Sequence, residues 1–163
     1  MRSLVLLLSA AAAAGASDGK PASGRPPSGT AVFVCAHGNV KSMIASQWFN
    51  RLAGEQGVAV RSVSRGVTPE NPVPAPIAGR MRQDGFDLAA FEARALVPAD
   101  AEAASRIVLI GVDAPSWVEG SGRPVERWDD IPPTSEGFEG TRDALRARVE
   151  SLLGTLKKGK PAR

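Results

Sequence analysis

The stretch Ala31–Ser42 constrains the fold more than any other part of the chain, because it joins an apolar strand directly to an amphipathic helix. The strand is predicted over 30–34 and the helix over 40–53. The apolar side of that helix is formed by Met43, Ile44, Trp48, Phe49 and Leu52. A β-branched run that changes at once to helical periodicity is typical of a βα unit in a parallel sheet.

The loop between this strand and helix carries the only cysteine of the 163 residues, Cys35. Backbone N–H groups at a helix N-terminus form a site that suits an oxyanion. The same partial positive charge favours the thiolate form of a cysteine. Cys35 is therefore the candidate nucleophile, and the candidate oxyanion-binding residues are Ala36, His37, Gly38, Asn39, Val40, Lys41 and Ser42.

Strands and helices alternate along the rest of the chain. Further strands are predicted over 58–64, 106–112 and 124–128, and helices over 75–83, 98–105 and 138–156, with a loop over 113–122. This order predicts an α/β fold, a three-layer α/β/α arrangement with a four-stranded parallel sheet. Ligands bind beyond the carboxyl ends of such strands, where Cys35, Asp129 and Asp130 would lie.

The two ends of the chain differ in composition from the middle. Residues 1–16 have a basic start, an apolar run and an Ala-x-Ala-like end, which is typical of a secretory signal peptide. Residues 17–29 read as a disordered Gly/Pro/Ser linker, 30–156 as the folded domain, and 157–163 as a basic tail. We therefore expect export to the bacterial periplasm or the medium, with no membrane attachment after cleavage.

Several classes of function are disfavoured by charge and composition. Although the pI is about 9.5, residues 30–156 hold 13 Lys and Arg against 16 Asp and Glu, which argues against a nucleic-acid partner. One cysteine and one histidine are too few for a structural metal site, and we expect no metal or cofactor. The glycines that a Walker-type phosphate loop needs before Lys41 are missing.

Four segments, in order, resemble those of low-molecular-weight protein tyrosine phosphatases and the arsenate reductases that share their fold. The first is the Cys-x5-Lys-Ser loop from Cys35 to Ser42. The others are Ser62-Val-Ser-Arg-Gly66, Asp84-Gly-Phe-Asp-Leu88 and Trp128-Asp-Asp-Ile-Pro-Pro133. The resemblance covers roughly residues 30–156 and implies the phosphotyrosine protein phosphatase I fold.

This resemblance implies a two-step phosphoryl transfer from phosphotyrosine or a small phosphomonoester. Cys35 would form a phosphocysteine, and Asp130 or Asp129 would protonate the leaving oxygen and later activate water. The two aspartates could instead cap the last helix. Ser42 could cap the first helix and hydrogen-bond the Cys35 thiolate. Arg65, which follows the second strand, could contribute a guanidinium to the site from the side, but it is interpreted as part of a surface ion pair.

Two other functions remain open at this stage. Arsenate reduction would use the same thiolate, but the lone cysteine means that an external thiol must resolve the arseno-cysteine. A non-catalytic oxyanion-binding or regulatory module is the third reading, because Lys41 replaces the family's usual Arg and lacks its bidentate geometry. His37, beside the nucleophile, could stabilise the thiolate or bind the oxyanion in part compensation.

Overall fold

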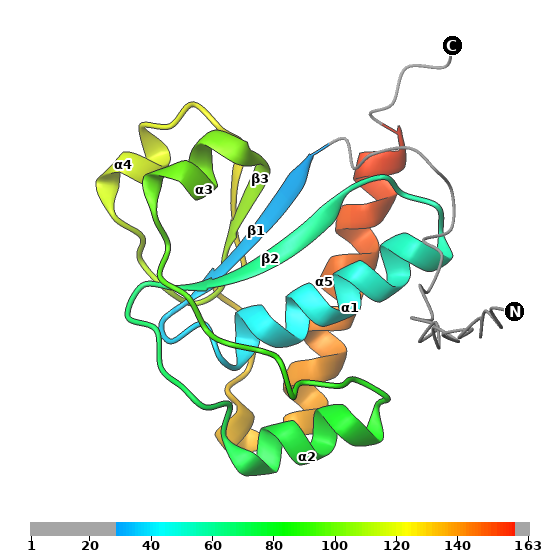
Figure 1. The fold of residues 1–163 in the computed structure, drawn as a ribbon. Coiled ribbons are helices and arrows are strands. Elements are labelled where there is room, and N and C mark those ends of the chain that lie inside the picture. The colour runs from blue at the N-terminus through cyan, green and yellow to red at the C-terminus, as the bar shows by residue number, and fades with distance from the viewer. Residues whose placement is uncertain (1–28, 159–163) are drawn as a thin grey trace, which may run out of the picture.

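The computed structural model describes residues 29–158; the leader, nearly all of the linker and the end of the tail lie outside them. Four parallel strands form one sheet in the order β2-β1-β3-β4, which places the strand that leads to Cys35 in its middle (Figure 1). The strands are β1 Thr30–Cys35, β2 Arg61–Gly66, β3 Ala104–Leu109 and β4 Val125–Arg127. The predicted four-stranded parallel α/β fold is confirmed.

Helices cover both faces of this sheet, as Figure 1 shows. The helices are α1 Lys41–Glu55, α2 Ala75–Gln83, α3 Pro98–Ala103, α4 Ser116–Glu119 and α5 Phe138–Lys158, with a 3-10 turn η1 at Thr134–Glu136. Residues of α1, α2 and α5 share one hydrophobic cluster with the sheet, and residues of α3 and α4 share the other. Alternate β1 residues face the two clusters, Phe33 one and Val34 the other, because successive strand side chains point to opposite faces.

The larger cluster holds the aromatic centre of the protein. Phe33 lies 5.6 Å, centroid to centroid, from both Phe49 of α1 and Trp128 after β4. The Trp128 side chain is fully buried, and its indole N–H donates to Glu126 Oε1 at 2.8 Å. The chain on either side of the Cys35 loop and the start of the Asp129–Asp130 segment are thus fixed to the same core.

The largest differences from the predicted element boundaries concern β2, β3 and α4; the other strands and the helices α1, α2, α3 and α5 begin and end within two residues of the prediction. β2 begins at Arg61 rather than residue 58, because the Val58 N–H still bonds the Ala53 carbonyl at the end of α1, at 2.8 Å. β3 covers Ala104–Leu109 rather than 106–112, since Gly111 adopts φ +57° and ends the extended chain. The predicted loop over 113–122 contains the short helix α4.

No helix within residues 29–158 is long and apolar enough to span a membrane. Across the same residues, no group of three or more His, Cys, Asp or Glu is placed to bind a metal ion.

Candidate active site

Cys35 is the last residue of β1 and lies at a hollow of about 270 Å³. Its side of the hollow is formed by loop residues that lead into α1, among them His37, Asn39 and Lys41. The opposite side is formed by Ile110 and Gly111 after β3 and by Pro133 and Thr134 after β4. Loops from three parallel strands therefore meet at the carboxyl edge of the sheet, as the fold predicts.

Cys35 is buried, with only 6% of the residue exposed, and two hydrogen-bonding groups contact its sulfur. The Gly38 N–H donates to Sγ at 3.3 Å, and Ser42 Oγ lies 3.0 Å from Sγ. The first N–H of α1 that makes a helical hydrogen bond is that of Ile44, which bonds the carbonyl of the N-cap residue Val40 at 2.8 Å. The earlier N–H groups, including those of Lys41 and Ser42, have no intrahelical acceptor and are available to an anion.

Ser42 does not cap α1, because the N-cap residue is Val40 and no side chain caps the helix. Its hydroxyl instead joins a buried chain: Ser42 Oγ lies 2.8 Å from Ser64 Oγ, and Ser64 donates to the Gly38 carbonyl at 2.8 Å. Ser42 Oγ also reaches the Arg65 carbonyl at 3.3 Å. The hydroxyl can therefore accept from a thiol or turn its proton toward a thiolate without losing all partners.

Sequence reasoning placed Ser64 in a family-like segment but missed its contact with this chain. The spacing of the serines in the sequence could have predicted this contact. Ser42 and Ser46 are one helical turn apart, and Ser62 and Ser64 are two residues apart on a strand, so each pair shares one face. Both contacts form, Ser42 with Ser64 at 2.8 Å and Ser46 with Ser62 at 3.0 Å.

Lys41, which stands where the resemblance leads one to expect arginine, lies at the hollow. Its Nζ donates to the Ile131 carbonyl at 2.9 Å. This bond joins the start of α1 to the segment after β4, across 90 residues of sequence. Lys41 thus supplies a positive charge to the hollow and also fixes the loop opposite Cys35.

The two aspartates proposed as proton donors are held outside the hollow by arginines. Asp130 forms an ion pair with Arg148 of α5, and Asp129 accepts from Arg127 Nε at 3.0 Å. Their side chains are 64% and 56% exposed, and neither is among the described residues that line the hollow. Neither caps the last helix, because η1 separates them from Phe138, where α5 begins.

The Arg148 guanidinium, by hydrogen-bonding the carboxylate, holds the pKa of Asp130 below its usual range. A lowered pKa in the folded state stabilises the protein above the ordinary carboxyl pKa, and this contribution is lost as the pH falls through the lowered value. A proton donor needs the opposite shift, because it must hold its proton at the working pH. This arrangement keeps Asp130 ionised.

We therefore expect Asp130→Asn to lower the melting temperature slightly at neutral pH. The difference from wild type should shrink as the pH falls below about 4, where an ordinary carboxyl group is protonated. Thermal melts across a pH series measure it. Arg148→Gln should give the same pH-dependent loss, and a difference between Asp130→Asn and wild type that does not change with pH would contradict this assignment.

Two other residues singled out in the sequence have structural roles. Arg65 pairs with Asp100 at 2.8 Å, and both side chains are mostly buried, so the ion pair is less exposed than predicted. Trp48 is buried in the larger cluster, where its ring lies 5.1 Å from that of Phe86. Neither is among the described residues that line the hollow at Cys35.

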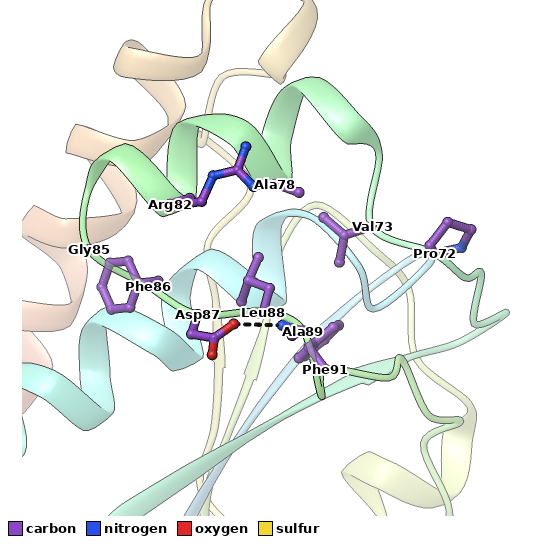
Figure 2. A pocket seen from close by; sticks show the side chains of 10 residues that line it. All are labelled: Pro72, Val73, Ala78, Arg82, Gly85, Phe86, Asp87, Leu88, Ala89 and Phe91. Atoms are coloured by element: carbon purple, nitrogen blue, oxygen red, sulfur yellow. Dashed lines mark hydrogen bonds between the residues drawn. The ribbon is translucent and has the colours of Figure 1, made fainter.

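A second hollow, of about 560 Å³, lies between α2 and the segment that follows it (Figure 2). Its lining is mainly apolar, from Val73, Phe86, Leu88 and Phe91. It adjoins the Cys35 loop through Pro72, whose carbonyl accepts from Asn39 Nδ2 at 3.4 Å. Asn39 is almost fully buried, and its contact with Pro72 anchors the middle of the loop.

Comparison with known proteins identifies the fold. Neither protein-family models nor curated sequences give a match. Among solved structures, a thioredoxin-dependent arsenate reductase of Corynebacterium glutamicum has a TM-score of 0.69 and 17% identity, over 82% of this chain and 64% of that one. A low-molecular-weight protein tyrosine phosphatase of T. tengcongensis has a TM-score of 0.66 and 17% identity, over 78% and 99%.

The YwlE arginine phosphatase from Geobacillus stearothermophilus is similar to the same degree, with a TM-score of 0.66 and 15% identity, over 82% of this chain and 99% of that one. This protein therefore has the fold shared by low-molecular-weight protein tyrosine phosphatases and arsenate reductases, as the four sequence segments predicted. Within that fold, Cys35 follows the first strand.

Proposed function

We propose that the protein is a cysteine-dependent phosphatase that hydrolyses phosphotyrosine or small phosphomonoesters through a phosphocysteine. One observation carries the proposal: Cys35 Sγ lies at the edge of a hollow, with the Gly38 N–H and the Ser42 hydroxyl within hydrogen-bonding distance. Both groups can donate a hydrogen bond to a thiolate, which is the form in which cysteine acts as a nucleophile. The similar structures named above include phosphatases, which supports the same class of substrate.

In the first step Sγ attacks phosphorus, and the bond from phosphorus to the leaving oxygen breaks. The loop N–H groups from Ala36 to Val40 and the start of α1, with Lys41, would hold the remaining phosphate oxygens. In the second step water attacks phosphorus, and the electron pair of the S–P bond returns to sulfur. The assignment of Asp130 or Asp129 as proton donor stays a prediction, and it requires that Arg148 or Arg127 release the carboxylate.

The cellular setting belongs to the same proposal. The apolar leader of the sequence supports export, and an exported protein would act outside the cytoplasm. A phosphate ester or free oxyanion is the proposed partner. An external thiol would be needed only for arsenate reduction, because the chain has one cysteine.

Acid quenching of the protein during hydrolysis of 4-nitrophenyl phosphate tests this function. We expect steady release of 4-nitrophenol and a phosphate adduct, detected by mass spectrometry, on the peptide that contains Cys35. Absence of turnover and of the adduct, with phosphate still raising the melting temperature, would contradict the phosphatase and favour the binding module. Arsenate consumption that depends on added thiol, without ester hydrolysis, would favour the reductase.

A further inference from the structure

His37, the only histidine of the chain, forms a pair with Glu70 at the hollow that contains Cys35. The imidazole Nδ1 lies 3.2 Å from Glu70 Oε1 and 3.3 Å from the Thr68 carbonyl oxygen. His37 itself is one of the lining residues of the hollow, two positions from the nucleophile. Nothing in the reaction proposed above uses this pair.

Backbone hydrogen bonds hold His37 and Glu70 beside each other. After β2, the chain runs beside the Cys35 loop and donates three hydrogen bonds to it. The N–H groups of Val67, Thr68 and Glu70 bond the carbonyls of Cys35, Ala36 and His37, at 3.1, 2.8 and 3.0 Å. Glu70 is therefore bound to His37 through both its backbone and its side chain, so the pair is fixed to the loop that carries the nucleophile.

The partners of Nδ1 also fix which nitrogen can exchange a proton. A carboxylate and a carbonyl oxygen both accept, so Nδ1 must carry a hydrogen to satisfy either of them. The other nitrogen, Nε2, bonds none of the described residues. Glu70 is the charged group that contacts this ring, and the other titratable groups among the described residues lining the same hollow are Cys35 and Lys41.

We propose that His37, oriented by Glu70, is the proton donor and acceptor of the phosphatase cycle; this rests on the function proposed above. In this cycle the ring starts as an imidazolium, with a hydrogen on both nitrogens. As Sγ attacks phosphorus, the leaving oxygen keeps the electron pair of the broken P–O bond and takes the proton from Nε2, which leaves a neutral imidazole. Nε2 then accepts a proton from the water that attacks the phosphocysteine. Sulfur leaves as thiolate, and the imidazolium is restored with the release of phosphate.

This role needs no movement of the arginine-bound aspartates. Asp129 and Asp130 would have to leave Arg127 and Arg148 before either could deliver a proton, and they do not line the hollow. His37 lines it and is 51% exposed, so a leaving group can reach the ring. His37 can therefore exchange a proton at the hollow without first breaking the ion pair of Asp129 or Asp130.

A pair of substrates with different leaving groups tests the assignment. 4-Nitrophenolate leaves without protonation, whereas the more basic phenolate of phenyl phosphate depends on a proton donor. We expect His37→Asn to lower kcat/KM for phenyl phosphate by about 10²-fold or more, with little change for 4-nitrophenyl phosphate. Asparagine keeps an N–H for Glu70 and Thr68, so the loop should stay folded.

Further variants distinguish a positioning role of Glu70 from a purely structural one. Glu70→Gln should lower kcat/KM for phenyl phosphate by a smaller factor than His37→Asn does, with little change in kcat/KM for 4-nitrophenyl phosphate. Glu55 is an exposed glutamate at the other end of α1, so Glu55→Gln is the matched control and should leave kcat/KM unchanged for both esters. Thermal melts of each variant check that the fold is retained.

If His37→Asn lowered kcat/KM equally for both esters, the assignment would be overturned, because a structural or binding role does not distinguish leaving groups. A selective loss of phenyl phosphate hydrolysis in Asp129→Asn or Asp130→Asn would also overturn it and support the aspartate. If the wild type hydrolyses neither ester, the proposed function fails, and the histidine's role fails with it.

Discussion

Cys35→Ser is expected to reduce the hydrolysis of 4-nitrophenyl phosphate on the order of 10⁴-fold or more, because a serine hydroxyl cannot replace the thiolate as nucleophile. The substitution changes one buried atom, and its neighbours Gly38 and Ser42 can donate to oxygen as well as to sulfur. The variant should therefore remain folded and still bind phosphate. Initial rates and the rise of melting temperature with phosphate measure both expectations.

A graded variant tests the donors around the sulfur. Ser42→Ala removes the hydroxyl that lies 3.0 Å from Sγ, and we expect a rate loss of about 10- to 10²-fold. Ser46→Ala is a matched control, one helical turn away, because the Ser46 hydroxyl bonds Ser62 instead. Equal rates in the two variants, or a Cys35→Ser protein as active as wild type, would contradict the proposed chemistry.

The part of the fold that follows from local pattern was predictable from the sequence. The strand before Cys35, the helix after it and α2 lie within two residues of the predicted ranges, because apolar runs indicate burial and turn residues mark where elements end. The parallel pairing followed from the alternation of strands and helices. The wrong boundary of β2 has a local cause as well, since the end of α1 continues to bond residue 58.

Contacts that join distant segments could not be predicted in the same way. Spacing placed Asp129 and Asp130 at the carboxyl edge of the sheet, but it carries no information about Arg148 of α5, which lies 18 residues further along the chain and pairs with Asp130. The bond from Lys41 to the Ile131 carbonyl and the pairing of His37 with Glu70 are of the same kind. Sequence reasoning therefore located the candidate nucleophile and its loop but missed the groups that contact them from distant segments.

The Cys35 loop packs so closely against β2 that a larger residue at Gly66 should affect both stability and activity. A Cβ added at Gly66 would lie 2.7 Å from the His37 carbonyl carbon and 2.9 Å from the Gly38 nitrogen. Both atoms are backbone, so no flexible side chain can move aside. Gly38 itself has φ +72°, a conformation that favours glycine, so the loop has little freedom to adjust.

We expect Gly66→Ala to lower the free energy of unfolding by about 1–3 kcal/mol, the usual effect of forcing an extra methyl group into a packed site. It should also reduce phosphatase activity by about 10²-fold, because displacing the loop by 1 Å moves the donors away from the phosphate oxygens. Urea unfolding and initial rates measure the two losses.

Gly54→Ala is the matched control for this substitution. Gly54 lies inside α1, and an added Cβ meets no atom within 4 Å, so alanine should raise the free energy of unfolding by roughly 0.5–1 kcal/mol through its higher helix propensity. Activity should not change, since Gly54 is near the end of α1 that is remote from Cys35. If Gly66→Ala unfolded like wild type and kept its activity, the backbone of β2 would not be what holds the loop in its binding conformation. A loss of stability without a loss of activity would show that the loop keeps its geometry when β2 is displaced.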